Sequence, residues 1–218
     1  MTLYAMSVSG NCWKVAWMLR LCGVPHKIVA TTYDGANGTL RTRSPEFLSK
    51  NPNGQTPLLE LDDGRFLAES NAILLYLTER YQKMMPPPDP ANCYLRGQVY
   101  QWLFFEQYSH EPYIAVRRAN IIFQRPTTAE AMQKLLEKGN NALQVMEVQP
   151  KKTSSFIAGG SEPSVADIAL YAYTGMAEEG GYDFTQYPAV KSWLARIKAL
   201  PYFEGTEILR EIEYVPPK

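Results

Sequence analysis

Four prolines crowd the stretch from Met84 to Pro90, at positions 86, 87, 88 and 90. Proline fixes the backbone φ angle and has no N–H to donate, so neither a helix nor a strand can run through such a stretch. Strand and helix signals alternate before it, whereas strand signals disappear after it. The sequence therefore predicts an α/β domain over residues 1–82, a linker over 83–90 and an all-α domain over 91–218.

The first domain is predicted to open with a right-handed β-α-β unit. Its first helix ends at Gly23-Val24-Pro25, a glycine stop followed by proline, and Asp62-Asp63-Gly64 is a strong hairpin turn signal. The elements are expected at residues 3–6 (strand), 12–22 (helix), 26–32 (strand), 45–48 (helix), on either side of 62–64 (two strands) and at 71–77 (helix), with residues 34–43 as a loop. The predicted order is β-α-β-α-β-β-α.

The second domain is predicted to be helical throughout. Its helices are expected at residues 94–120 (bent near Pro112), 129–148, 165–176, 188–200 and 202–212. Ser164 and Asp167 have the spacing of a capping box at the start of the third of these helices, with aspartate in place of the usual glutamate. We interpret Asp167 as a folding cap and not as a catalytic acid.

Composition excludes several classes of protein. Lysine plus arginine and aspartate plus glutamate number 22 each, which is not the basic excess of a nucleic-acid binder. No apolar run is long enough to span a membrane and no signal pattern opens the chain, so we expect a cytoplasmic protein. The three cysteines form no Cys-x-x-Cys pair, and there are only two histidines, which argues against a metal site.

One segment predicts a site for a small acidic peptide. Pro57 begins a predicted strand, and a proline there leaves the backbone N–H and C=O of Thr56 able to pair with an extended ligand. Ser70 is a good N-cap for the helix that follows, and helix N-termini attract anions. A peptide-binding edge and a carboxylate site therefore lie within one short segment.

The turn after the first strand contains Ser9-Gly10-Asn11-Cys12. In a β-α-β unit this turn lies at the carboxyl end of the strand and at the N-terminus of the helix, where ligands bind and thiolates are stabilised. Serine stands where a redox protein would have the first cysteine. The Ser9 hydroxyl could donate to a thiolate carried by a ligand, or it could only cap the helix.

These segments together resemble the cytosolic glutathione transferases, in particular the serine-type bacterial and theta-, delta- or zeta-like members. The resemblance is carried by Ser9-Gly10-Asn11-Cys12, residues 51–57 (Asn-Pro-Asn-Gly-Gln-Thr-Pro), 69–73 (Glu-Ser-Asn-Ala-Ile) and 164–167 (Ser-Val-Ala-Asp), and it spans essentially the whole chain. It implies a thioredoxin-like N-terminal domain that binds glutathione, followed by an all-helical domain.

The resemblance also implies roles for particular residues. Ser9 would stabilise the glutathione thiolate, with Asn11 beside it where many serine-type members have proline. Pro57 would be a cis-proline, and the Thr56 backbone would pair with the cysteinyl unit of the peptide. Glu69 and Ser70 would hold the γ-glutamyl amine and carboxylate.

Further roles concern the two ends of the site. Gln55 would lie near the glycine end of glutathione, together with Lys50 or Arg43. Val8, Tyr108 and Tyr113 would line a pocket for the second substrate. Ser7 and Tyr4 are the competing hydroxyls, and His110 is more readily interpreted as a structural histidine than as an acid or base.

The implied function is that of a homodimeric glutathione transferase, which activates the thiolate for attack on a hydrophobic electrophile. Two alternatives stay open. One is a glutathione-dependent isomerase, dehalogenase or peroxidase on the same fold. The other is a non-catalytic binding module of this family.

Overall fold

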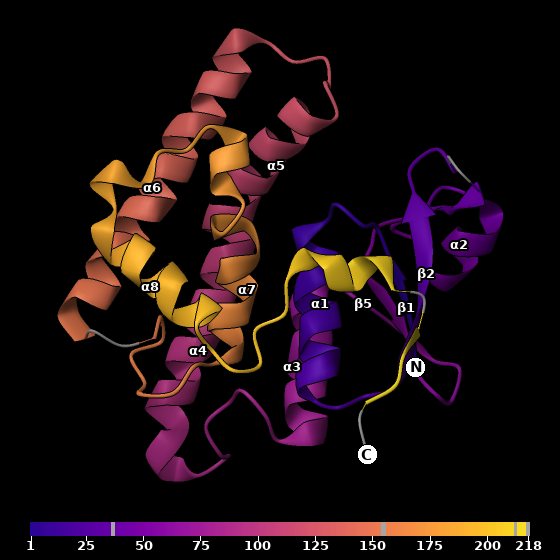
Figure 1. The fold of residues 1–218 in the computed structure, drawn as a ribbon, viewed down its shortest axis with the longest axis horizontal. Helices are drawn as coiled ribbons and strands as arrows, with labels where there is room; N and C mark the ends of the chain where they lie inside the picture. Colours follow the sequence, from indigo (N-terminus) through magenta and orange to yellow (C-terminus); the bar gives the residue numbers. More distant parts are fainter. Residues whose placement is uncertain (36–37, 154–155, 212, 217–218) are drawn as a thin grey trace. The chain divides into compact units, whose positions relative to one another are not determined.

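The computed structural model describes residues 1–35, 38–153, 156–211 and 213–216, and of residues 150–153 only the backbone. The chain divides into two units, one formed by Met1–Lys83 together with Tyr202–Lys218 and the other by Met84–Pro201. The first unit is a mixed sheet with helices and the second is helical (Figure 1). This is the predicted fold class, a thioredoxin-like domain followed by a helical one.

The first unit is built on a sheet with the strand order β3-β2-β1-β4-β5. The strands are β1 (Thr2–Ala5), β2 (His26–Thr32), β3 (Leu40–Arg41), β4 (Leu58–Glu60) and β5 (Phe66–Ala68). Strands β1 and β2 are parallel, as the β-α-β prediction requires, while β4 is antiparallel to both β1 and β5. The two-residue strand β3 lies inside the segment that was predicted to be a loop, because so short a strand has no periodicity to reveal it.

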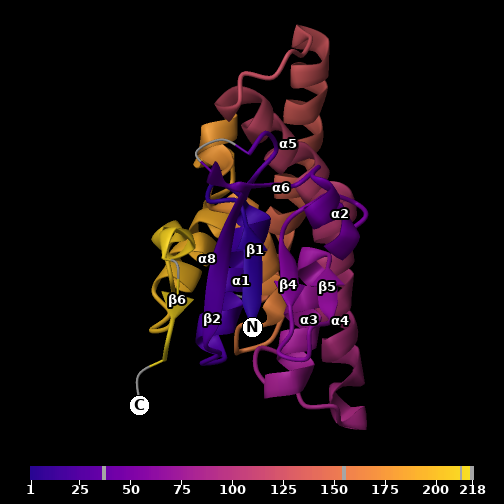
Figure 2. The ribbon, with the colours of Figure 1, turned by 90° about the vertical axis from the view of Figure 1, so that its right-hand side faces the viewer.

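Helices cover both faces of this sheet (Figure 2). Helices α1 (Gly10–Leu21) and α3 (Ser70–Tyr81) pack together on one face, and α2 (Pro45–Lys50) lies on the other. The buried core between α1, α3 and the sheet includes Leu3, Val15, Leu19, Leu59, Ile73, Leu74 and Leu77. On the α2 face, Tyr4, Phe47 and Leu58 form a second buried cluster.

The last segment of the chain packs on the first unit, which corrects both the predicted domain boundary and the predicted helix at 202–212. It forms a short 3-10 helix over Thr206–Arg210 and then strand β6 (Glu213–Tyr214), which pairs with β2. The indole N–H groups of Trp13 and Trp17 donate to the carbonyl oxygens of Glu204 (3.0 Å) and Tyr202 (2.6 Å). Through these two bonds, the tryptophans of α1 hold the backbone of the last segment against that helix.

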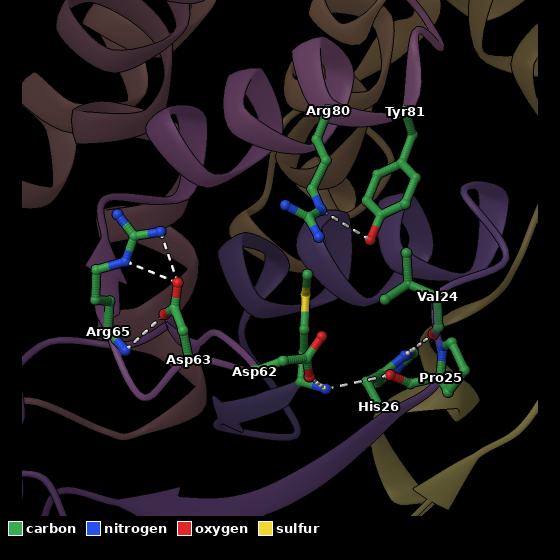
Figure 3. A network of polar contacts seen from close by, with 9 residues as sticks. Val24, Pro25, His26, Asp62, Asp63, Arg65, Arg80 and Tyr81 are labelled. Carbon is green, nitrogen blue, oxygen red and sulfur yellow. Dashed lines mark hydrogen bonds and ion pairs between the residues drawn. The ribbon is translucent and has the colours of Figure 1, made fainter.

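His26 lies where this segment meets the sheet. The residue is 3% exposed, and its ring lies 5.3 Å from the Tyr214 ring. Its Nδ1 lies 2.8 Å from the Val24 carbonyl oxygen (Figure 3). A carbonyl oxygen only accepts hydrogen bonds, so Nδ1 carries the proton of the neutral ring. Burial, and more weakly the positive charges of Arg20 and the Met1 ammonium, lower the pKa of His26; its hydrogen bond to Val24 and the Glu211 carboxylate act in the opposite direction.

We expect His26 to make the first unit less stable in mild acid. Because its pKa is lower in the folded than in the unfolded state, its contribution is complete above a pH of about 6.5 and is lost as the pH falls toward the folded pKa. Urea unfolding between neutral and mildly acidic pH should show this loss. The variant His26→Asn keeps a donor for Val24 but does not titrate, so its free energy of unfolding should change less with pH. An equal change with pH in both proteins would contradict the assignment.

The second unit consists of α4 (Cys93–Phe105), α5 (Glu111–Ile122), α6 (Ala129–Thr153), α7 (Val165–Thr174) and α8 (Pro188–Lys198). Helices α4 and α5 are the predicted long helix, joined by a π-helical turn over Glu106–His110 in which the Glu111 N–H donates to the Glu106 carbonyl. Pro112 has no N–H for the α-helical ladder, and a widened turn is one of the known ways a helix absorbs such a break.

The predicted capping box at the start of α7 is present. Asp167 is fully buried, and its Oδ2 accepts from the Ser164 N–H (2.8 Å) and the Ser164 hydroxyl (3.0 Å). Its Oδ1 accepts from the Ile157 N–H (2.8 Å) and from the indole N–H of Trp193 in α8 (2.9 Å). With all these donors satisfied inside the helical unit, Asp167 joins three segments of that unit.

Candidate functional site

Ser9 caps helix α1, and this cap forms one wall of the site. Its backbone is extended, and its Oγ accepts from the Cys12 N–H at 3.3 Å. A hydroxyl has two acceptor lone pairs and one proton, so accepting this bond does not use the proton, which can be donated to the Cys12 sulfur or to a ligand. The two interpretations of Ser9 from sequence are therefore compatible, because the same hydroxyl can cap the helix and donate to a ligand.

Cys12 lies behind Ser9 and is inaccessible. Its side chain is fully buried, and its sulfur accepts from the Met6 N–H at 3.3 Å. Burial raises the pKa of the Cys12 thiol, although hydrogen bonds with Ser9, Met6 and Thr56 act in the opposite direction. A buried neutral thiol is a poor nucleophile. Cys12 instead ties the opening turn to Thr56, which belongs to the next part of the site.

The loop before β4 is organised by Asn51. Its side-chain nitrogen donates to the Gln55 carbonyl at 2.8 Å, its side-chain oxygen accepts from the Asn53 N–H at 3.2 Å, and its backbone carbonyl accepts from the Gly54 N–H at 2.9 Å. The sequence pattern marked this stretch as a turn but did not single out Asn51. Asparagine followed by Pro-Asn-Gly is a recognisable signal for a turn in which the asparagine side chain bonds to the backbone of the residues that follow it.

The Thr56–Pro57 peptide bond that follows is cis. In the part of the chain that the structure describes, Thr56 takes part in no backbone hydrogen bond of a turn or sheet. Pairing of its N–H and C=O with an extended ligand stays a prediction, based on its place before a proline at the start of a strand.

Arg43 lies against this loop, whereas the Lys50 ammonium lies over two aromatic rings. A side chain at Gly54, whose φ is +62°, would meet the Arg43 Nη1 at 2.9 Å, so only glycine lets the guanidinium approach this closely. The Lys50 ammonium lies over the rings of Tyr4 and Phe66, 5.9 and 5.2 Å from their centres. Of the two cations considered for the glycine end, Arg43 is the one that lies against Gly54, next in the chain to the exposed Gln55.

A third turn, Glu69–Ser70, begins α3. Glu69 and not Ser70 occupies the N-cap position, which corrects the predicted cap, and Ser70 is the first helical residue. Glu69 has φ 65° and ψ 111°, a backbone conformation that is rare for a residue with a side chain and is concentrated at functional sites. The Glu69 side chain is exposed, makes no capping bond and is free to face a ligand.

Asn11 connects the first and third turns. The Ser70 hydroxyl donates to the Asn11 Oδ1 at 3.3 Å, between residues 59 positions apart. Asn11 lies in the first turn of α1 and Ser70 in the first turn of α3, so the N-termini of two packed helices meet here. Helix N-termini carry partial positive charge, which favours an anion at this place.

The remaining candidates are dispersed. The Tyr4 hydroxyl donates to Glu60 Oε2 (2.8 Å), and burial and this carboxylate raise the pKa of Tyr4 to about 12, so it is a packed core hydroxyl. Ser7 and Val8 are exposed in the opening turn. Tyr108 and Tyr113 belong to the helical unit, where Tyr108 is 83% exposed.

His110 is a structural residue of the helical unit. It is fully buried, and its Nε2 lies 2.8 Å from the hydroxyl oxygen of Thr174 in α7. Neither a cluster of metal-binding side chains nor a helix long and apolar enough to cross a membrane occurs within the residues described above.

Comparison with known proteins agrees with this geometry. Residues 3–88 match the family "Glutathione S-transferase, N-terminal domain", and residues 102–201 match "Glutathione S-transferase, C-terminal domain". The crystal structure of a glutathione S-transferase from Pseudomonas fluorescens is 43% identical in sequence, covers 94% of this chain and 98% of its own, and superposes with a TM-score of 0.84.

Two more distant relatives are informative. The transcriptional regulator URE2 of Saccharomyces cerevisiae is 25% identical over 240 residues, which cover 92% of this chain and 65% of that protein. The structure of Ure2p in complex with glutathione is 23% identical, covers 96% of this chain and 93% of its own and has a TM-score of 0.81, a likeness of fold. On the match of both domains, the chain belongs to the glutathione S-transferase family.

Proposed function

We propose that the protein binds glutathione on its first unit and transfers the glutathionyl thiolate to a hydrophobic electrophile. The observation that carries this proposal is the convergence of three turns: the Ser9 cap of α1, the cis Thr56–Pro57 bond and the strained Glu69–Ser70 turn. Cys12 joins the first turn to the second, and Asn11 joins the first to the third.

Each turn supplies one part of a site for a γ-glutamyl tripeptide. The backbone of Thr56 pairs with the cysteinyl unit, and the carboxylate of Glu69 faces the ammonium group. The first turn of α3, with Ser70, receives the α-carboxylate, where the N-terminal partial charge favours it. Arg43 and Gln55 receive the glycine end, and Lys50 is the less favourable candidate there because its ammonium lies over two aromatic rings.

The chemical task of Ser9 is modest. A free thiol with a pKa of about 8.5 is only a few per cent ionised at neutral pH. Lowering that pKa by about two units requires about 2.7 kcal/mol of preferential stabilisation of the thiolate. A charge-assisted hydrogen bond from Ser9 supplies about 1.5–3 kcal/mol, and the N-terminus of α1 adds to it.

Calorimetric titration with glutathione and a chromogenic conjugation assay test this proposal. We expect Ser70→Ala to weaken glutathione binding by about tenfold or more, because a hydrogen bond to a carboxylate is lost. Ser9→Ala should leave binding nearly unchanged and raise the pKa of the bound thiol by about one unit. Because the ionised fraction at pH 7 then falls from about three quarters to about one quarter, turnover at neutral pH should fall about threefold.

Ser7→Ala is the matched control, since Ser7 is an exposed hydroxyl of the same turn, and it should behave as the unmodified protein. If Ser9→Ala leaves the thiol pKa unchanged, the activating group is Asn11, Ser7 or the backbone. Absence of any heat of binding in the unmodified protein would overturn the proposal.

A non-catalytic binding module of this family is the second candidate. The relationship to a protein described as a transcriptional regulator favours it, and binding of glutathione without conjugation would identify it. Val8, Tyr108 and Tyr113 stay proposed contacts of the electrophile. A homodimer in the cytoplasm stays the proposed state, and light scattering of the purified protein tests the dimer.

A further inference from the structure

The proposed function gives Asn11 no role beyond its place near Ser9, yet the Asn11 side chain forms a hydrogen bond with Ser70. Its Oδ1 accepts the Ser70 hydroxyl proton at 3.3 Å. Ser70 is 6% exposed, so little water reaches it, and the hydrogen bond to Asn11 orients its hydroxyl. The orientation of Ser70, the residue proposed to receive the α-carboxylate, is therefore set from the first turn of a different helix.

This arrangement has a chemical consequence when a carboxylate arrives. A carboxylate only accepts hydrogen bonds, so the Ser70 proton must turn away from Asn11 and toward the ligand. The Asn11 amide carries an acceptor and a donor on one planar group whose terminal torsion is soft and close to two-fold. Reversing the amide places its N–H₂ against the Ser70 oxygen, which then accepts from Asn11 while donating to the carboxylate.

We propose that Asn11 is a positioning residue for the carboxylate end of glutathione, holding the Ser70 hydroxyl by an amide that reverses when the ligand binds. This inference rests on the proposed function and assigns Asn11 to carboxylate recognition instead of thiolate stabilisation. Hydrogen bonds in such a chain polarise one another, so the Asn11 and Ser70 contributions to affinity are coupled. Aspartate at position 11 has the same shape but cannot donate, and its charge would repel the carboxylate.

The test is a double-mutant cycle read by calorimetry. Its variants are Asn11→Ala, Ser70→Ala and their combination, and its ligands are glutathione and the analogue in which hydrogen replaces the glutamyl α-carboxylate. Asn11→Ala should weaken glutathione binding about fivefold, the size expected for one neutral hydrogen bond, and leave binding of the analogue unchanged. It should add no further loss in the Ser70→Ala background. The pKa of the bound thiol should not move.

Asn11→Asp supplies a second measurement, because aspartate has the shape of asparagine and, unlike alanine, leaves no cavity. It should weaken glutathione binding by more than Asn11→Ala does, with the excess disappearing for the analogue. Equal thermal midpoints of the variants separate these effects from misfolding. Independent losses in the cycle, equal losses for both ligands, or a raised thiol pKa in Asn11→Ala would each overturn the inference while glutathione binding itself persists. Failure of the unmodified protein to bind glutathione would instead overturn the proposed function, and this inference with it.

Discussion

Replacing Asp167 with alanine is expected to lower the free energy of unfolding by about 3–5 kcal/mol. The carboxylate accepts hydrogen bonds from Ile157, Ser164 and Trp193, and it is fully buried. Alanine would leave these donors without an acceptor in the interior, and each unsatisfied buried donor costs about 1–3 kcal/mol. Urea unfolding of the full chain, monitored by tryptophan fluorescence, measures the loss.

Two further variants show whether the hydrogen bonds are responsible. Asp167→Asn keeps the shape but turns an N–H₂ toward donors in either orientation of the amide, so we expect an intermediate loss of about 1–3 kcal/mol. Asp183→Ala is the matched control, because Asp183 caps the 3-10 helix Phe184–Gln186 at an exposed position. It should cost about 1 kcal/mol or less. Equal losses for Asp167→Ala and Asp183→Ala would show that burial of the Ser164–Asp167 capping box adds nothing to the free energy of unfolding.

Gly139→Ala is expected to destabilise the helical unit by about 2–4 kcal/mol, although alanine is ordinarily the better helix former. A Cβ at position 139 would overlap the ring and hydroxyl of Tyr182. Tyr182 is 2% exposed, and its hydroxyl lies 2.9 Å from the Leu135 carbonyl oxygen and 3.3 Å from that of Tyr113. The ring therefore has little room to retreat.

Gly97→Ala is the matched control for this prediction. Gly97 also lies within a helix of the same unit, but nothing stands within 4 Å of the position its Cβ would take. This substitution should raise the free energy of unfolding by about 0.5–1 kcal/mol through the gain in helix propensity. Opposite signs for the two glycines are expected in thermal or urea unfolding, and equal signs would contradict the packing argument.

Much of the first unit could be predicted because its signals are local. Gly23-Val24-Pro25 ends a helix and Asp62-Asp63-Gly64 turns a hairpin through the conformations that glycine and proline favour, whatever surrounds them. Strands β3 and β6 could not be predicted, because two residues have no period. The helix predicted at 202–212 was wrong for a different reason: Trp13 and Trp17, far away in the sequence, hold the backbone carbonyls of that segment.

The candidate site also has features that local sequence predicts and features that it does not. The positions of Ser9, Thr56, Pro57, Glu69 and Ser70 were recognisable because each follows a short pattern of residues at a turn. The choice between Arg43 and Lys50 was not, since it depends on which side chain passes the bare backbone of Gly54. The N-cap at Glu69 was missed because a positive φ at a glutamate has no signature in the sequence.

By itself, then, the sequence determined the two-domain order, the family resemblance and the residues of three separate turns, because proline, glycine and capping residues act over only a few positions. The tertiary structure alone decided that the turns meet, that the chain's last segment returns to the first unit, and that Asn11 reaches Ser70 across 59 positions. Contacts between residues far apart in the chain depend on how helices and strands pack, and no local pattern records that packing.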